Sequence, residues 1–234
     1  MNKYTHLNLH SEYSIQDGLI RINDLAQKAS DLNFESLAIT DSSNLFGFIK
    51  FYKELRKKGI KPICGSDFSL LGENTNSGNL QLLVKNHKGY KNLIRLISKS
   101  HTTGKINGSP FLSVKDLEEF SEGLLLITGG IDSQIGQSIL DGKNDIALKQ
   151  IKYLKNLYKD NFFLQLTRTG KNQEELCNQS LIEFADTLSI PVVATNQVRF
   201  LSKEDFEAHE TRVCIQSGHV LGDQRRQRFF QDSQ

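Results

Sequence analysis

The stretch Ser36-Leu37-Ala38-Ile39-Thr40-Asp41 is the best starting point for predicting the fold of this 234-residue chain. It is a short apolar run that ends in a carboxylate, which is typical of a buried strand. Apolar residues spaced by three and four precede it over 22–32, and a second helical pattern follows over 45–58. A helix, a buried strand and another helix in succession indicate an α/β protein.

The same alternation continues along the chain. Further strands are expected at 4–10, 60–64, 67–71, 80–84, 123–128, 162–167 and 191–195. Further helices are expected from Ser113 onward and at 90–99, 131–140, 144–158, 172–188 and 202–218. Segments 72–78 and 102–110 are rich in turn-forming residues and are expected to be loops. This order of elements favours an α/β barrel or a doubly wound sheet.

The composition excludes several classes of protein. Hydrophobic residues make up 38% and charged residues 24%, which is ordinary for a globular chain and excludes a disordered one. The formal net charge of +2 excludes a protein that coats nucleic acid by overall charge. The 3 cysteines are far apart, which argues against a disulfide framework. Without a signal sequence or a long apolar run, we expect a cytoplasmic chain that does not enter a membrane.

Polar side chains recur where the predicted strands end. They are His10, Asp41, Asp67, Gly129-Gly130, Arg168 and Asn196. Because the carboxyl ends of barrel strands form one mouth, we expect these side chains to converge. His10, Asp41 and Asp67, with Asp17 nearby, are residue types that bind a divalent metal and activate water. The alternative is that they cap helices and form turns. The residues alone favour this alternative, because no second histidine is closely paired with His10.

Other motifs point to few functions. The chain has no P-loop and no GxSxG elbow. Segment 223–230 mixes arginines with two phenylalanines, a combination that could contact nucleic acid. The favoured interpretation is an exposed connection that packs on something downstream. The chain stops at Ser233-Gln234 without completing an element, so we expect a fragment of a longer protein.

Several blocks of sequence, in order, resemble the PHP (polymerase and histidinol phosphatase) domain of bacterial replicative DNA polymerase III alpha subunits. The blocks are residues 6–14, 17–18, 38–41, 44–47, 59–68, 89–93, 123–130, 192–196 and 205–210. The resemblance implies a distorted (βα)7 barrel of the PHP type. It places the PHP domain at residues 1–218, with 219–234 starting the connection to a downstream polymerase region.

The sequence departs from the metal-binding members of that family. They carry His-x-His on the first strand, where this chain has Asn8-Leu9-His10, and Asp-His after the second, where it has Asp41-Ser42. A Glu after the third strand becomes Asp67, and the closing Asp-x-His becomes Gln197-Val198-Arg199. At three further positions where the family has a metal ligand, this chain has Asn79, Gly130 and Thr169.

The resemblance is therefore closest to the metal-free variant found in proteobacterial polymerases. It implies that no catalytic or metal site is intact and that His10, Asp17, Asp41 and Asp67 are remnants of a metal pocket. Three carboxylates in one pocket need a positive charge, and we expect Arg199 to supply it, since a guanidinium stays protonated and can bridge two carboxylates.

The resemblance also implies a function. The parent would be a DNA-directed DNA polymerase (a nucleotidyltransferase) in DNA replication, whose Mg²⁺ and DNA are bound outside this chain. This fragment would bind no cofactor and would be a scaffold that docks the proofreading exonuclease subunit beside other replisome subunits. The alternative is a stand-alone, metal-dependent PHP phosphoesterase. A third hypothesis, a nucleic-acid-binding module, depends only on segment 223–230.

Overall fold

A curled six-stranded sheet forms most of a barrel in the computed structural model, which describes residues 4–72 and 77–223. Its order is β2-β3-β4-β7-β8-β9. The strands are β2 (Ser36–Ile39), β3 (Lys61–Leu71), β4 (Ser77–Val84), β7 (Leu124–Gly129), β8 (Phe162–Leu166) and β9 (Val192–Ala194). Neighbouring strands are parallel except around β4, which runs antiparallel to both β3 and β7.

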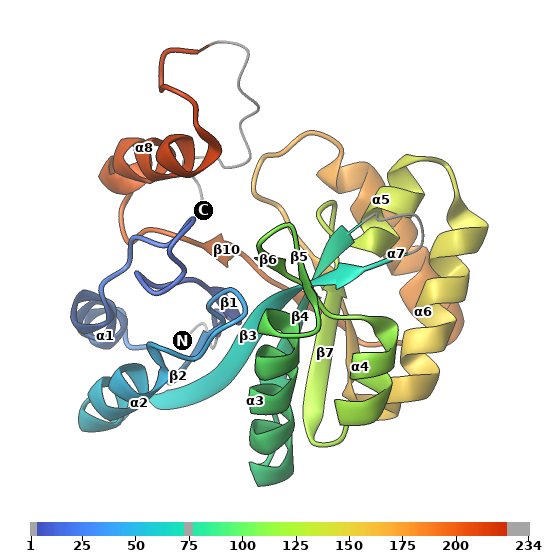
Figure 1. The fold of residues 1–234 in the computed structure, drawn as a ribbon, viewed down its shortest axis with the longest axis horizontal. Helices are drawn as coiled ribbons and strands as arrows, with labels where there is room; N and C mark the ends of the chain where they lie inside the picture. The colour runs from blue at the N-terminus through green and yellow to red at the C-terminus, as the bar shows by residue number, and fades with distance from the viewer. Residues whose placement is uncertain (1–3, 73–76, 224–234) are drawn as a thin grey trace.

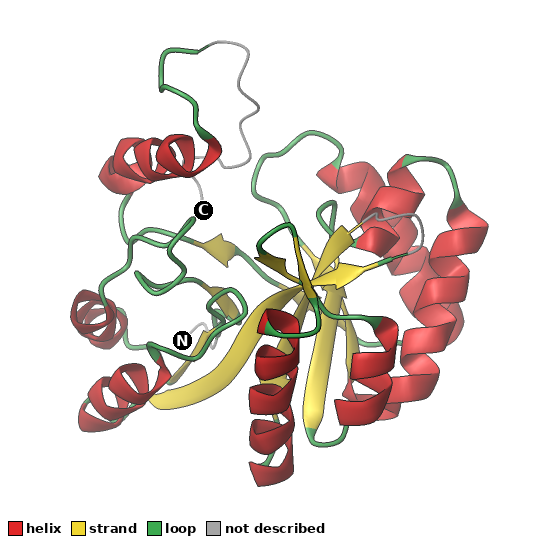
Figure 2. Ribbon diagram, in the orientation of Figure 1, coloured by secondary structure: helices red, strands yellow, loops and turns green. Residues whose placement is uncertain are grey.

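Two short strands complete the barrel. β1 (Asn8–Leu9) pairs in parallel with β10 (Gln197–Val198), which follows β9 directly. On its other side, the β1 segment accepts backbone hydrogen bonds from β2 and the residue after it, Ala38 N to His6 O at 3.0 Å and Thr40 N to Leu9 O at 2.9 Å. β1 therefore lies between β10 and the β2 edge of the six-stranded sheet, and β10 follows the strand at the other edge, β9 (Figure 2). The α/β barrel prediction is confirmed, whereas a doubly wound open sheet is not what forms.

Helices cover the outside of this sheet (Figure 1). They are α1 (Ile22–Asp31), α2 (Phe48–Lys57), α3 (His87–His101), α4 (Val114–Phe120), α5 (Gln134–Leu140), α6 (Asn144–Tyr158) and α7 (Glu174–Leu188). The last helix, α8 (Phe206–Ser217), lies apart from the sheet, beyond β10 (Figure 1). Short 3₁₀ turns at Lys159–Asn161 and Lys203–Asp205 precede β8 and α8. The helix predicted from Ser113 begins with a capping box, in which the Ser113 and Asp116 side chains bond each other's backbone N–H. None of the described helices is long and apolar enough to cross a membrane.

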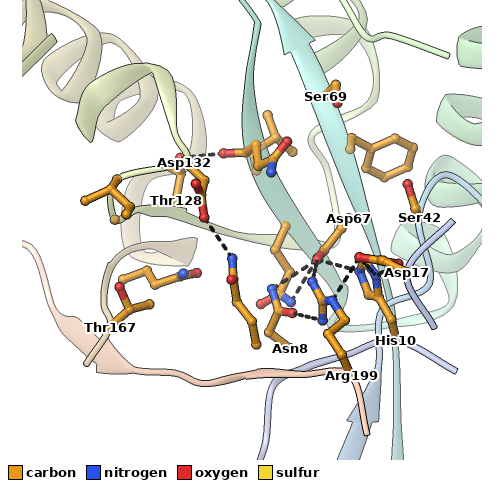
Figure 3. Close-up of a pocket in the computed structure, with 18 of the residues that line it drawn as sticks. Asn8, His10, Asp17, Ser42, Asp67, Ser69, Thr128, Asp132, Thr167 and Arg199 are labelled. Carbon is orange, nitrogen blue, oxygen red and sulfur yellow. Dashed lines mark hydrogen bonds and ion pairs between the residues drawn. The ribbon is translucent and has the colours of Figure 1, made fainter. Parts of the chain in front are cut away.

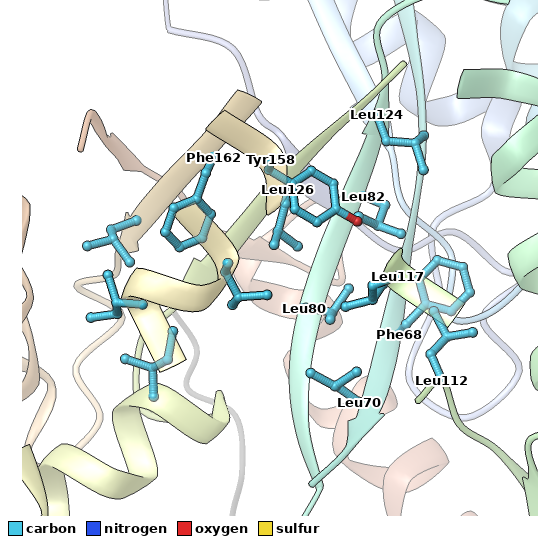
Figure 4. Packing of buried hydrophobic residues seen from close by; sticks show 14 of the residues in the cluster. Phe68, Leu70, Leu80, Leu82, Leu112, Leu117, Leu124, Leu126, Tyr158 and Phe162 are labelled. Atoms are coloured by element: carbon cyan, nitrogen blue, oxygen red, sulfur yellow. The ribbon is translucent and has the colours of Figure 1, made fainter. Parts of the chain in front are cut away.

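Strand alternation separates the core into layers. In β7, Leu124 and Leu126 face the large cluster beneath α3–α7, while Ile127 faces a small cluster with Ala38 and Leu83 inside the barrel. Figure 4 shows the large cluster, in which Phe68, Leu80 and Leu82 of the sheet pack beneath Leu112 and Leu117. A separate cluster joins β1 and β2 to α1 and α2. One end of the barrel interior is thus filled by apolar side chains, and the polar side chains lie at the other end.

Some sequence expectations were wrong in detail. The strands predicted at 60–64 and 67–71 are one long strand, β3, because the backbone stays extended through Gly65 and Ser66. The strand predicted at 4–10 is reduced to Asn8–Leu9. The loop predicted at 102–110 contains a small hairpin, β5 (Lys105–Ile106) with β6 (Ser109–Pro110). Of the predicted loop 72–78, residues 73–76 lie outside the described residues. Residues 224–230 of the arginine- and phenylalanine-containing segment 223–230 also lie outside the described residues.

Candidate functional site: a charge-neutral cluster in a barrel mouth

The candidate site is a cavity of about 340 Å³ at one end of the barrel. It is lined by the carboxyl ends of the parallel strands, where Thr128, Gly130 and Thr167 lie, and by residues after β1 and β10. Because β4 runs the opposite way, its amino-terminal half reaches the same end and contributes Asn79 and Gln81. Figure 3 shows side chains from these separate elements pointing into one space. The predicted convergence at the strand ends is therefore observed for part of the set.

Four charged side chains meet on one wall of the cavity. His10 follows β1 and lies between two carboxylates: its Nδ1 is 2.8 Å from Asp17 Oδ1, and its Nε2 is 2.9 Å from Asp67 Oδ2. Arg199, after β10, donates from Nε to Asp17 Oδ2 at 2.9 Å, and its Nη2 lies 4.0 Å from Asp67 Oδ2. We call His10, Asp17, Asp67 and Arg199 the mouth quartet.

The mouth quartet carries two positive and two negative charges. Burial and the nearby Arg199 lower the pKa of His10, but the charge of Asp17 and hydrogen bonds with both carboxylates outweigh them and raise it to about 9. Burial raises the pKa of Asp17, but the charges of His10 and Arg199 and the His10 hydrogen bond hold it well below its ordinary value. At neutral pH His10 is therefore an imidazolium, and the cluster neutralises itself.

Two carboxamides complete the hydrogen bonding of the quartet. Asn8 donates to Asp67 Oδ2 at 3.0 Å and accepts from Arg199 Nη1 at 2.9 Å. Gln81 lies directly opposite Asp67 across the β3–β4 pair and donates to Asp67 Oδ1 at 3.0 Å. Both oxygens of Asp67 are therefore occupied. Sequence reasoning missed Gln81, although a glutamine inside the apolar run 80–84 was a signal that could have found it.

Asp41 does not join the quartet, contrary to the expectation that three aspartates share one pocket. Its carboxylate is buried and points to the turn after His10, where it accepts from Ser11 N, Ser11 Oγ and Ser14 Oγ, each at 2.7 Å. The same turn requires Gly18, because a Cβ there would lie 1.8 Å from Ser11 O. Asp41 therefore anchors the loop that carries Asp17, and it acts on the site through that loop.

A second polar group lines the opposite wall of the cavity. Lys171 Nζ lies 3.3 Å from Asp132 Oδ2 and 3.0 Å from Gln197 Oε1, and Gln197 donates to Asp132 at 3.1 Å. Glu174 shapes the loop before Lys171 by accepting from Thr169 N and from its hydroxyl, both at 2.7 Å. Neither Asp132 nor Lys171 directly follows a strand, so the strand-end pattern could not single them out.

The other residues singled out in the sequence lie outside the mouth quartet and make contacts that support the fold. Arg168 pairs with Glu175 on the surface and takes no part in the cavity. His209 of α8 is buried, and its Nε2 bonds the backbone oxygen of Asp17 at 3.0 Å. The three cysteines are free and buried, and burial raises the pKa of the Cys64 thiol to about 12. These observations agree with a structural histidine and an inert Cys64.

The residues present do not fit the metal that this type of barrel implies. Metal ligation needs a free imidazole lone pair, yet both ring nitrogens of His10 lie within hydrogen-bond distance of carboxylates. The Arg199 guanidinium fills the space beside Asp17 where a cation would neutralise it. Among the residues that the structure describes, no group of three or more His, Cys, Asp or Glu could hold a metal ion.

The barrel thus has one reversed strand and a mouth in which a histidine and an arginine pair with two aspartates. The chain belongs to the PHP domain family: the model of that family, described as PHP domain, matches residues 6–169. It is 40% identical over 236 residues to DNA polymerase III subunit alpha of Escherichia coli K12 and 38% identical over 234 residues to that of Vibrio cholerae. These matches cover 99% of the chain but only 20% of each relative, so the chain spans about a fifth of their length.

Solved structures of other proteins share the fold at low identity. A putative metal-dependent phosphoesterase from Bifidobacterium adolescentis aligns with a TM-score of 0.58 at 10% identity, covering 86% of this chain and 89% of that one. An amidohydrolase from Chromobacterium violaceum aligns with a TM-score of 0.55 at 11% identity, covering 89% and 96%. At this identity the similarity concerns the fold alone.

Proposed function

We propose that this chain is a non-catalytic PHP region of a replicative DNA polymerase III alpha subunit, acting as a scaffold and as a docking surface for the proofreading exonuclease subunit. The observation that carries the proposal is the mouth quartet. In it, two cationic side chains, His10 and Arg199, already pair with Asp17 and Asp67, the carboxylates that a catalytic metal would need. A site whose cations are part of the protein has no vacancy for a water-activating ion.

Homology supports the link to replication. The 36–40% identity to alpha subunits extends over 99–100% of this chain, so the whole barrel corresponds to a part of those proteins. Nucleotide transfer to a primer, with its Mg²⁺ and its contacts to DNA, is then assigned to polymerase regions outside these 234 residues. The proposal places the protein in the cytoplasm with the other replisome subunits.

A stand-alone metal-dependent phosphoesterase is the rival function. The fold similarity to a putative phosphoesterase favours it, but the donor set of the cavity does not. Asn8 stands on the first strand where the metal-binding pattern described above has histidine, and its amide is already bonded to Asp67 and Arg199. The wall around Asp132 and Lys171 is likewise internally paired.

Metal content tests the absence of a catalytic centre. The purified protein, dialysed against a weak chelator, is expected to contain far less than one zinc, manganese or iron per chain by elemental analysis. It is also expected not to hydrolyse bis(p-nitrophenyl) phosphate when Mn²⁺ or Zn²⁺ is added. One tightly held metal per chain together with metal-dependent hydrolysis would establish the phosphoesterase instead.

Docking is tested by titration calorimetry with the purified exonuclease subunit of the same organism. We expect saturable binding and co-elution at tens of micromolar or below. Binding of the isolated chain to single-stranded DNA should be weak and strongly salt-dependent, because the net charge is only +2. No heat and no co-elution with the exonuclease subunit would refute the docking function.

A further inference from the structure

The outward face of α2, with the residue before it, carries exposed large apolar side chains. Phe46, just before the helix, is 72% exposed, and Ile49 and Tyr52 within it are 55% and 46% exposed. The residues that hold the helix to the barrel, Phe51 and Leu55, are fully buried on the opposite side. The exposed apolar side chains therefore contribute nothing to the packing of α2, and they gather at spacings of three along its outer side.

Helix α3 extends this surface. The ring of Phe48 lies 6.2 Å from Tyr52 on its own helix and 6.2 Å from Tyr90 on α3, so it connects the two helices. One turn beyond Tyr90, Ile94 is 41% exposed. We call Phe46, Ile49, Tyr52, Tyr90 and Ile94, with the cations described next, the α2–α3 face. An apolar set spread over two neighbouring helices is typical of an interaction site.

Positive charges surround these apolar side chains. Lys53, Arg56 and Lys91 are exposed and form no ion pair with any described residue. Lys50 has a partner, Glu12, but at 3.7 Å and with its side chain 42% exposed. Because the whole chain carries only +2, this local excess of cations sets the face apart from the rest of the sequence. Its complement is a segment that presents both apolar side chains and carboxylates.

We infer that the α2–α3 face is the surface on which the exonuclease subunit docks, through an acidic segment whose apolar residues cover Phe46, Ile49 and Tyr52. The inference rests on the proposed docking function and adds to it a location and a chemistry. Ile49 and Ile94 favour a protein segment, because an isoleucine offers no ring on which a base stacks. Phe46, Tyr52 and Tyr90 do offer rings, so single-stranded nucleic acid is the other occupant that the binding experiment separates. Carboxylates of the partner would pair with Lys53, Arg56 and Lys91.

The location separates docking from the barrel mouth. The residues of the α2–α3 face line no part of the cavity. Figure 1 shows α2 on the opposite side of the view from α6, with α3 near the middle. A partner on this face therefore leaves the mouth quartet untouched, and changes to the quartet reach docking only through the stability of the fold.

The test is a charge and size change on α2 with a matched change on α6. The paired substitution Ile49→Ala with Lys53→Glu alters one exposed isoleucine and one exposed lysine of the face. The control, Ile146→Ala with Lys149→Glu, alters the same residue types on α6. Both are made in the polypeptide at its natural length, and circular dichroism melts establish that each variant folds. Binding of the purified exonuclease subunit is measured by calorimetry at low and high salt.

We expect the α2 pair to weaken exonuclease binding tenfold or more and the α6 pair to leave it unchanged. The wild-type protein should bind more weakly at high salt, and this salt dependence should shrink in the α2 pair. Tight wild-type binding that both variants retain would overturn the location while leaving the docking function intact. Absence of wild-type binding would remove the docking function itself and the inference with it. Loss of (dT)₂₀ binding by the α2 pair, with exonuclease binding unchanged, would show a nucleic-acid surface instead.

Discussion

Replacing Arg199 with alanine should destabilise the protein through charge and not through lost packing. The side chain of Arg199 is only 5% exposed and binds Asp17, Asn8 and the backbone oxygen of Val198. Without it, the mouth quartet keeps one imidazolium against two carboxylates, so one negative charge is left without a partner in a buried site.

The size of the effect follows from how much water can reach that charge. Breaking a fully buried pair costs roughly 3–5 kcal/mol. The side chains of Asp17 and Asp67 are 21% and 15% exposed, so water relieves part of the imbalance and we expect about 3 kcal/mol, the lower end of that range. Arg199→Lys, which keeps the charge but loses the planar fork, should show a smaller loss.

The loss should depend on pH in a defined direction. The pKa of Asp17 is lowered in the folded protein, so its stabilising effect is full above the ordinary value of 3.8 and disappears as the pH falls through the lower, folded value. Removing Arg199 moves the folded pKa of Asp17 back toward 3.8. The free energy of unfolding of the variant therefore falls less in acid than that of wild type. The difference between the two free energies should stay constant near neutrality and narrow below about pH 4.

Urea unfolding from pH 7 to pH 3 measures this gap, since urea does not screen charges as guanidinium does. Arg168→Ala is the matched control, because Arg168 also pairs with a carboxylate but its side chain is 77% exposed. It should leave the urea midpoint unchanged. Equal unfolding free energies for wild type and Arg199→Ala at pH 7 would refute the role of Arg199 as the counter-charge.

Three further predictions concern the same end of the barrel. The folded pKa of His10, about 9, lies above the ordinary 6.5, so its stabilisation is full below pH 6.5 and is lost as the pH rises through 9. At about 1.4 kcal/mol per tenfold change in proton affinity, this loss reaches at most ~3.5 kcal/mol, and urea unfolding at pH 6, 8 and 10 should reveal it in wild type but not in His10→Gln. Gly18→Ala should cost about 1–3 kcal/mol in thermal unfolding because its Cβ would meet Ser11 O, whereas Gly222→Ala, which meets nothing within 4 Å, should melt like wild type. Asp41→Ala should cost at least ~2 kcal/mol, since it strands the donors of Ser11 and Ser14, and an unchanged urea midpoint would show that water replaces the carboxylate.

The sequence predicts the helices and most strands because their apolar periodicities are strong. It also finds His10, Asp67 and Arg199, since each lies beside or beyond the paired part of a parallel strand, where side chains of a barrel converge. The reversal of β4 was missed, although two strands predicted at 67–71 and 80–84 with only a loop between them are typical of a hairpin, because a parallel pair needs a longer crossover. That reversal is what brings Gln81 to the mouth.

Asp41 shows a different limit. From the sequence it is equivalent to Asp67, since both are aspartates at the end of an apolar stretch. Which of them faces the cavity depends on the serines of the turn after His10, whose short hydroxyls reach Asp41 and satisfy it locally. A carboxylate at a strand end is therefore a poor guide to a shared site unless its nearest hydrogen-bond donors are also known.

The pairing of β1 with β10 has a consequence for how the protein is made. Asn8 pairs with Gln197, a separation of 197 − 8 = 189 residues, so the ring cannot close until nearly all of the barrel has been synthesised. At translation rates of about 5–20 residues per second, roughly 10–40 seconds pass between the synthesis of β1 and the synthesis of β10. During that interval the edge of β1 that later pairs with β10 has no partner strand. The two-residue length of β1 limits the hazard, because so short an edge offers little template for incorrect pairing.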